Sequence, residues 1–446
     1  MIYKTQRHEL RPVWRTVILT ISIVFSIVIS GYCFNTNSAS KTVSTDGSYT
    51  DTAAAVASVT RKDEDGWTVT IGSPGGSYTW PTMLDINMPH VVTIQGASST
   101  DRPTITINAT TGFGVFIAAT EGKTITLKDL HFDSWKTGNG LILIFGGGDD
   151  CFRLTNLEFT GSNSSCVWVS ALGATSTKPG PYGLIDHCSI PSGGGLIFVR
   201  DNPLATPASW HRPMSWGTKH AVYVEDCNFS APKPLVGVWG VSDGDNGGRI
   251  VIRHCTMQNM PLATHGADSQ PLENGQNPNH SMLQVEVMHN TFTATGPIDT
   301  FLFLRGGTAT VFDNTINRTG DGFLNTLIKP SFYRSIPGNG VCPVDRTYPA
   351  DYLGTQQPGS GVVDVPGQDP KNPKQPWGSV PIYVWNNHIN APITYGQVGG
   401  SEFIQPNRDY FVDKERPNYT EFVYPHPLQG GSTTGTAPKP SSDAHK

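Results

Sequence analysis

A six-residue pattern of apolar and polar positions recurs along this chain. It starts with an apolar residue, has a small, amide or apolar residue at its fourth position, and ends on Phe, Ile or Met. The copies are LKDLHF (127–132), LTNLEF (154–159), IDHCSI (185–190), VEDCNF (224–229), IRHCTM (252–257), VMHNTF (287–292), VFDNTI (311–316) and VWNNHI (384–389). Their spacing predicts a repeating unit of about 24 to 28 residues, interrupted by insertions of variable length.

A second short apolar strand lies between most copies. The segments are LILIF (141–145), CVWV (166–169), LIFV (196–199), VGVW (236–239) and FLFL (301–304). Several strands per unit with no helical segment between them predict an all-β, right-handed parallel β-helix, in which each turn stacks about 4.8 Å from the next. The one helix we expect lies early, over residues 50–60, and covers the open end of the solenoid.

The columns of the repeat predict which side chains are buried. The fourth position holds Leu130, Leu157, Cys188, Cys227, Cys255, Asn290, Asn314 and Asn387. We expect the Asn side chains to bond up and down the solenoid, and Cys188, Cys227 and Cys255 to be small buried hydrophobes. A disulfide among Cys151, Cys166 and Cys342 stays open. The third position mixes His187, His254 and His289 with Asp and Asn, which indicates polar turn residues rather than metal ligands.

The termini and insertions follow from composition. Basic residues precede an apolar run from 17 to 34, so residues 1–40 are expected to be a secretory signal peptide or an uncleaved membrane anchor. The predicted β-helix domain spans 42–428, with an N-terminal cap at about 46–95 and insertions at about 201–219 and 319–378. Residues 429–446 are expected to be a disordered tail.

Overall composition limits the partners. The chain has 48 Gly and 34 Pro, 15% charged residues and a net charge of −5, with no long basic run beyond residue 40. This argues against nucleic acid as a ligand. We expect an exported or cell-surface protein, present as a monomer.

Several blocks carry a family resemblance: GLIDHCSI, AVYVEDCNFS, GGRIVIRHCTMQN, LRGGTATVFDNTIN, PIYVWNN, and the closing RDYF with YPHPL. Together they resemble the secreted bacterial right-handed β-helix proteins of the pectin-lyase-like superfamily, over residues 45–428. The resemblance implies the fold and a range of activities: polysaccharide lyases, polygalacturonase-like hydrolases, pectin esterases, tailspikes and adhesins. The fold alone does not choose among them.

A stripe of charged residues is the candidate for chemistry. Reading up the solenoid, it contains Arg200, Asp243 and Asp245, His265, Asp268 and Arg305. A lyase acting on uronate sugars needs a cation for the carboxylate, a base, and a proton for the leaving oxygen. His265, Arg305 and Arg200 are the candidate catalytic residues. Asp243, Asp245 and Asp268 are candidate Ca²⁺ ligands.

The expected ligand is an acidic extracellular polysaccharide, cleaved by β-elimination. Aromatic and basic side chains in the insertions and near the strands are candidates for binding sugar rings: Trp210, Arg212, Trp216, Trp239 and Tyr348. The main alternative is a non-catalytic carbohydrate-binding surface or adhesion protein. A polygalacturonase-like hydrolase is a further alternative, because GDDC (148–151) and THG (264–266) resemble parts of that signature.

Overall fold

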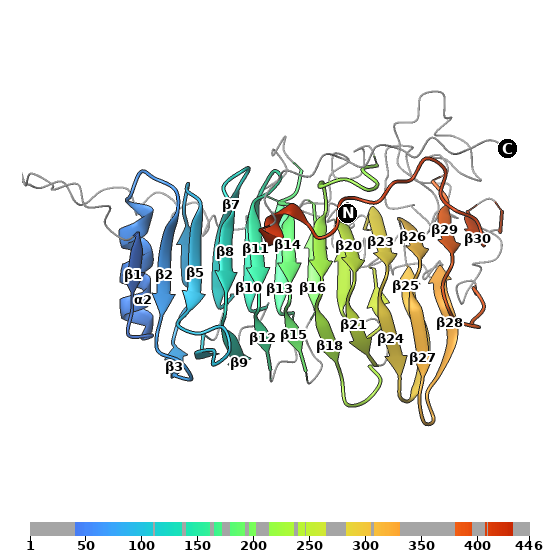
Figure 1. Cartoon of the computed structure of the whole chain (residues 1–446), viewed down its shortest axis with the longest axis horizontal. Helices are drawn as coiled ribbons and strands as arrows, with labels where there is room; N and C mark the ends of the chain where they lie inside the picture. Colours follow the sequence, from blue (N-terminus) through green and yellow to red (C-terminus); the bar gives the residue numbers. More distant parts are fainter. Residues whose placement is uncertain are drawn as a thin grey trace, which may run out of the picture. The chain divides into compact units, whose positions relative to one another are not determined.

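A computed structural model gives the structure of this protein, and its strands form parallel sheets stacked into a β-solenoid (Figure 1). The structure describes residues 41–109, 112–135, 140–160, 165–171, 179–191, 196–201, 214–235, 240–245, 247–264, 282–304, 307–330, 380–394, 406–407 and 409–430. The predicted all-β parallel solenoid is confirmed.

Sheet A contains twelve strands in the described residues, paired in parallel and in chain order. They are β1 (Thr42–Ser44), β2 (Trp67–Ile71), β5 (Val92–Gly96), β8 (Ile125–Lys128), β11 (Phe152–Thr155), β14 (Gly183–Asp186), β17 (Val222–Glu225), β20 (Arg249–Arg253), β23 (Gln284–Met288), β26 (Thr308–Phe312), β29 (Ile382–Trp385) and β30 (Tyr410–Val412).

Sheet B follows sheet A in most turns. Its strands are β3 (Ser77–Trp80), β6 (Thr104–Ile107), β9 (His131–Trp135), β12 (Glu158–Phe159), β15 (Ser189–Ile190), β18 (Asn228–Ser230), β21 (Thr256–Gln258), β24 (Thr291–Ala294) and β27 (Thr315–Arg318).

The third side of the solenoid is divided between two sheets. Sheet C comprises β4 (Leu84–Asn87), β7 (Val115–Thr120), β10 (Ile142–Gly147), β13 (Val167–Ala171), β16 (Ile197–Arg200) and β19 (Ser242–Asp245). Sheet D comprises β22 (Leu262–Ala263), β25 (Pro297–Leu304) and β28 (Phe323–Pro330). β28 lies inside the segment predicted as an insertion from 319, so that prediction began too early in the chain.

The fourth position of the repeat forms a buried column, as predicted. The backbone N–H of Cys255 donates to Asn290 Oδ1 at 2.9 Å, and that of Asn290 donates to Asn314 Oδ1 at 3.1 Å. The N–H of Asn314 in turn donates to Asn387 Oδ1 at 3.1 Å. Because each amide accepts from the turn before it, the column satisfies backbone groups that would otherwise be buried without partners.

The backbone conformation at the third position of the repeat explains why polar residues occupy it. All eight residues adopt a left-handed backbone with φ between 50° and 59°: Asp129, Asn156, His187, Asp226, His254, His289, Asp313 and Asn386. Asn, Asp and His tolerate this conformation better than most other side chains. The column therefore marks the sharp turn from sheet A to sheet B, which supports the interpretation of these histidines as turn residues.

The predicted early helix is confirmed as α2 (Tyr49–Thr60). The Ser48 hydroxyl accepts from the backbone N–H of Asp51 at 3.3 Å, which caps the first turn. The helix buries Ala55, Val56 and Val59 against the first strands of the solenoid. Hydrophobic burial thereby closes the end of the core.

The cysteine predictions are also confirmed where the structure describes the residues. Cys188, Cys227 and Cys255 are buried free thiols in the column, and Cys151 and Cys166 are likewise buried and free. Burial raises the pKa of the Cys151 and Cys166 thiols to about 12. Cys342 lies outside the described residues.

The C-terminal segment, residues 413–430, ends in the short 3-10 helix η4 (Pro427–Gln429). It runs from β30 back along the outer face of sheet A as far as β14 (Figure 1). Residues 1–40, which carry the predicted signal, and residues 431–446 of the predicted tail lie outside the described part of the chain. Within that part, no helix is both long and apolar enough to cross a bilayer.

Candidate functional site

The outer face of sheet A is occupied by the protein's own C-terminal segment. Arg253 and Glu225, on adjacent strands, form an ion pair of 2.6 Å in which both side chains are 0% exposed. Arg253 also donates to the carbonyls of Phe422 and Val423, at 2.5 and 2.7 Å. Through these two bonds the cross-strand ion pair holds the segment in place.

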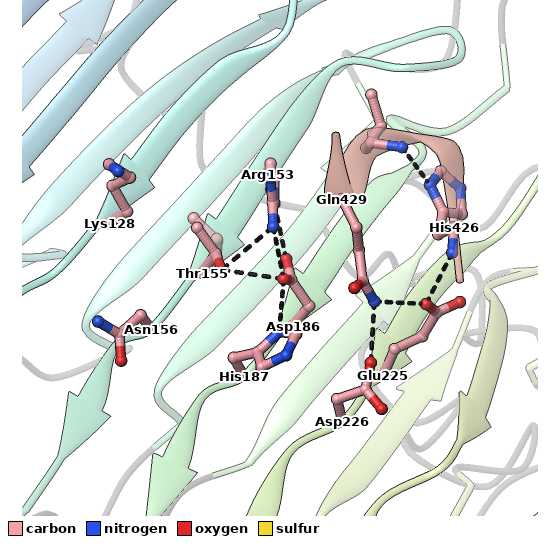
Figure 2. A network of polar contacts seen from close by, with 12 residues as sticks. Lys128, Arg153, Thr155, Asn156, Asp186, His187, Glu225, Asp226, His426 and Gln429 are labelled. Carbon is pink, nitrogen blue, oxygen red and sulfur yellow. Dashed lines mark hydrogen bonds and ion pairs between the residues drawn. The ribbon is translucent and has the colours of Figure 1, made fainter. Parts of the chain in front are cut away.

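Figure 2 shows the polar network at the end of this segment. Glu225 accepts from the backbone N–H of His426 at 3.0 Å and from Gln429 Nε2 at 2.9 Å. One turn earlier, Asp186 accepts from Arg153 Nη2 at 2.7 Å and contacts His187 Nδ1 at 2.9 Å. These carboxylates already have internal partners, so this part of the sheet A face is a packing surface.

The outer face of sheet C presents a different composition. Its register places side chains from six consecutive strands in two outward rows. The first row is Asp85, Phe116, Leu143, Trp168, Phe198 and Asp243, and the second is Asn87, Ala118, Phe145, Ser170, Arg200 and Asp245. We call these two rows the sheet C face.

Aromatic side chains form the middle of the sheet C face. Trp168 and Phe198 stack with ring centroids 4.6 Å apart and planes 19° from parallel. Phe116 and Phe145 lie 6.3 Å apart on neighbouring strands. Trp168, Phe116 and Phe145 are only half-buried. Because aromatic rings on a sheet normally point into a core, partly exposed rings in register across several turns are typical of a binding surface.

A charged pair lies at the end of these rows. Arg200 donates from Nε and Nη2 to the two carboxylate oxygens of Asp245, at 2.7 Å each. Its guanidinium also lies 5.4 Å from the Trp168 ring centroid and 5.2 Å from that of Phe198. The bidentate pair and the two rings fix the position of the guanidinium beside the aromatic side chains.

Asp243, the neighbour of Asp245 on the same face, is 0% exposed. One of its oxygens accepts from the backbone N–H of Gly244 at 2.8 Å. Both aspartates belong to strand β19, whereas the sequence predicted that the strand would end before them, at 239. Strand β19 therefore places Asp243 and Asp245 on the sheet itself.

The structure brings together only part of the predicted site. Arg200, Asp243 and Asp245 meet on adjacent strands. The remaining predicted catalytic and metal-binding residues, and most of the predicted sugar-binding ones, lie outside the described residues: His265, Arg305, Asp268, Trp210, Arg212, Trp239 and Tyr348. Their predicted roles stay predictions.

Trp216 is described, and it lies away from the sheet C face. The guanidinium of Arg416 sits 3.9 Å from its ring centroid. The adjacent Ser215 and Gly217 donate backbone N–H groups to Gln284 and Glu286 of β23. Trp216 therefore packs between the C-terminal segment and sheet A, where Arg416 covers one face of the ring that was predicted to bind sugar.

The predicted calcium site is described only in part, because Asp268 lies outside the described residues. Both oxygens of Asp245 face Arg200, and Asp243 is fully buried. In the described ranges there is no group of three His, Cys, Asp or Glu side chains able to hold a metal ion. A Ca²⁺ role for Asp243, Asp245 and Asp268 remains a prediction.

The aromatic rows were missed by the sequence analysis, although a signal was present. In the predicted second strands the outward positions alternate with core residues, and those positions hold Phe145, Trp168 and Phe198. Outward aromatic side chains on consecutive strands, on the face opposite the core, distinguish a surface row from core packing.

Comparisons with known proteins find similarity only to solved structures, and at a low level. No family model matches it, and no curated protein matches it. Among solved structures it is similar to an alginate lyase from Paenibacillus sp. str. FPU-7, with a TM-score of 0.38 and 15% sequence identity, over 64% of this chain and 97% of that chain. At this similarity the match supports no statement about the activity of this chain. Membership of the pectin-lyase-like superfamily stays a prediction.

Proposed function

We propose that this protein is exported, binds an acidic extracellular polysaccharide along the sheet C face, and cleaves it by β-elimination. The observation that supports binding is the presence of aromatic side chains on four consecutive strands of this face, with Arg200 beside them. Phe116, Phe145 and Trp168 are partly exposed, and Phe198 is buried beneath the Trp168 ring that stacks on it. The rows run along the solenoid axis, so successive sugar rings of one polymer would meet successive turns.

The chemistry of the face suits a uronate polymer. Flat aromatic faces pack against the C–H faces of sugar rings. Arg200 uses Nε and Nη2 for Asp245, and Nη1 takes no part in that pair. A guanidinium held in place in this way is suited to a sugar carboxylate, because its side chain loses little further conformational entropy when the ligand binds.

The test is binding to a panel of polymers, with Trp168→Ala as the variant. Loss of the ring that stacks on Phe198 should weaken binding of a uronate polysaccharide about tenfold, which corresponds to about 1.4 kcal/mol. Phe411→Ala is the matched control. Phe411 also stacks on a neighbouring ring, that of Tyr383 with centroids 5.1 Å apart, but this pair lies on the outer face of sheet A. Equal losses in the two variants, or binding of no polymer, would overturn the proposal.

Product analysis then separates the chemical alternatives. β-Elimination yields an unsaturated uronate that absorbs in the ultraviolet, whereas hydrolysis yields new reducing ends without that absorbance. Retained binding with neither product assigns the protein to the non-catalytic surface or adhesion class. Activity should also be compared with added Ca²⁺ and with a chelator, which tests the predicted metal independently.

A further inference from the structure

Side chains from three successive turns meet where the chain passes from sheet C to sheet A. Asp149 and Asp150 lie between β10 and β11, Tyr182 precedes β14, and Lys219 and His220 precede β17. We call these five residues the edge cluster. None of them belongs to the predicted stripe, and the closest contact in the cluster joins residues 71 positions apart.

The cluster contains an oriented Asp–His pair. His220 Nδ1 lies 2.7 Å from Asp149 Oδ1. The His220 side chain is 43% exposed, while that of Asp149 is only 15% exposed. Because the carboxylate accepts the proton on Nδ1, the imidazole presents Nε2 as its free proton acceptor. A shielded carboxylate that orients a more accessible imidazole is the arrangement that general bases use.

The neighbouring ion pair supports this geometry. Lys219 Nζ lies 2.8 Å from Asp150 Oδ2 and 3.6 Å from Asp149 Oδ2. The hydrogen bond with Asp150 raises the pKa of Lys219, so the ammonium remains charged beside the two carboxylates. The Tyr182 ring meets His220 edge-on, with centroids 6.3 Å apart. Lys219 and Tyr182 therefore restrict how Asp149 and His220 can move.

The backbone conformation of residues 148–150 determines where the carboxylates of Asp149 and Asp150 lie. Gly148 has φ +104°, and a Cβ there would lie 2.4 Å from Glu121 Cβ. Asp150 is left-handed with φ 54°. Gly148 and Asp150 are residue types that adopt these backbone conformations readily, so the turn fixes where the two carboxylates lie.

The edge cluster is also connected to the strand that carries Arg200. Asp201 follows Arg200 at the end of β16, and its Oδ1 accepts from the backbone N–H of Gly180 at 2.7 Å. Gly180 lies in the same segment as Tyr182. The end of the charged and aromatic row and the edge cluster therefore share one rim of sheet C.

We infer that His220 is the proton-transferring residue for cleavage and that Asp149 is its positioning residue; this rests on the proposed function. His220 Nε2 takes the proton from the sugar carbon next to the carboxylate. The electrons of that C–H bond form a C=C bond as the C–O bond to the next sugar breaks. The departing oxygen takes a proton from the imidazolium or from water, giving a new hydroxyl and an unsaturated uronate.

The experiment compares His220→Ala with His187→Asn in the full chain, on the uronate polysaccharide that the wild-type protein binds. His187 is a matched control because it also contacts an aspartate, Asp186, at 2.9 Å, but does so on sheet A. His220→Ala should lower kcat at least about 100-fold, the size of a lost general base. Polymer binding should be unchanged, and added imidazole should restore part of kcat. His187→Asn should keep wild-type kcat.

Asp149→Asn tests the positioning role. It should lower kcat with little change in KM, because the polymer contacts lie on the sheet C face and the tautomer of His220 is no longer imposed. Thermal unfolding of each variant shows whether the fold is intact. His220→Ala with more than a tenth of wild-type kcat, or no rescue by imidazole in a folded variant, would overturn the inference.

Failure of this inference is distinct from failure of the proposed function. A wild-type protein that binds polysaccharide but cleaves none removes the role of His220 and leaves binding by the sheet C face intact. A wild-type protein that binds none removes both. Cleavage that persists in His220→Ala preserves the proposed function and places the base elsewhere.

Discussion

Removing Arg253 should make the C-terminal segment open more often without unfolding the solenoid. Arg253 is the one described side chain that joins Glu225 to the carbonyls of Phe422 and Val423, and it is fully buried among them. Arg253→Met keeps much of the apolar volume and removes the charge together with its donors. Glu225 is then left buried without its counter-ion.

The size of the effect follows from these contacts. Breaking a buried ion pair by removing one partner costs about 3 to 5 kcal/mol. Glu225 keeps the N–H of His426 and the amide of Gln429, so the lower end of this range applies. A loss of about 3 kcal/mol raises the opening equilibrium of the segment by about two orders of magnitude, since 1.36 kcal/mol is a factor of ten.

Hydrogen exchange of backbone amides within residues 413–430 measures this opening directly. Arg153→Met is the matched control, because Arg153 pairs with Asp186 on the same outer face and the pair lies one turn from Glu225. Protection of the segment should fall about a hundredfold in Arg253→Met and remain near wild type in Arg153→Met. A change below fivefold in Arg253→Met, or the same change in both variants, refutes the reasoning.

Three further predictions concern pH and the turn columns. Burial, followed by the charge of Arg253, lowers the pKa of His426 from 6.5 to about 4, so the unfolded chain binds more protons and stability should fall by about 3 kcal/mol as pH drops through that window. His426→Asn, which keeps a capping acceptor for Leu428, should flatten this slope in urea titrations at several pH values; an unchanged slope contradicts it. Asn314→Leu should cost about 2 to 4 kcal/mol by urea unfolding, because the N–H of Asn290 loses its acceptor, and a neutral result would show that the amide column is dispensable. Asn386→Val should cost about 1 to 2 kcal/mol at φ 50°, while Asn386→Gly should be nearly neutral; equal effects would mean that backbone strain does not select this residue.

The fold was predictable because each turn repeats the same local requirement. The left-handed residue before the column selects Asp, Asn or His, and the column itself selects Asn, Cys or Leu, so both appear as periodic patterns in the sequence. Such requirements involve only neighbouring turns, and one sequence therefore reveals them.

Contacts between distant segments were not predictable in this way. Arg253 and Phe422 are 169 residues apart, and no periodicity relates the C-terminal segment to the strands it covers. The candidate site shows the same limit. The sequence indicated Arg200 and Asp245 separately, but their mutual ion pair depends on the register of β16 and β19. The Asp149–His220 contact likewise depends on how three turns stack.

The return path of the C-terminal segment has a consequence for the order of assembly. A solenoid whose turns contact only their neighbours can lose strands one at a time from either end. Here the last residues of the described chain dock on strands formed near its middle, through Glu225 of β17 and Arg253 of β20. Residues 413–430 can dock only after those strands exist, and the final turns are then joined to the interior of the array. Unravelling from the C-terminal end must begin with release of this segment, so proteolytic cutting within it should expose the last turns to further digestion before the first ones.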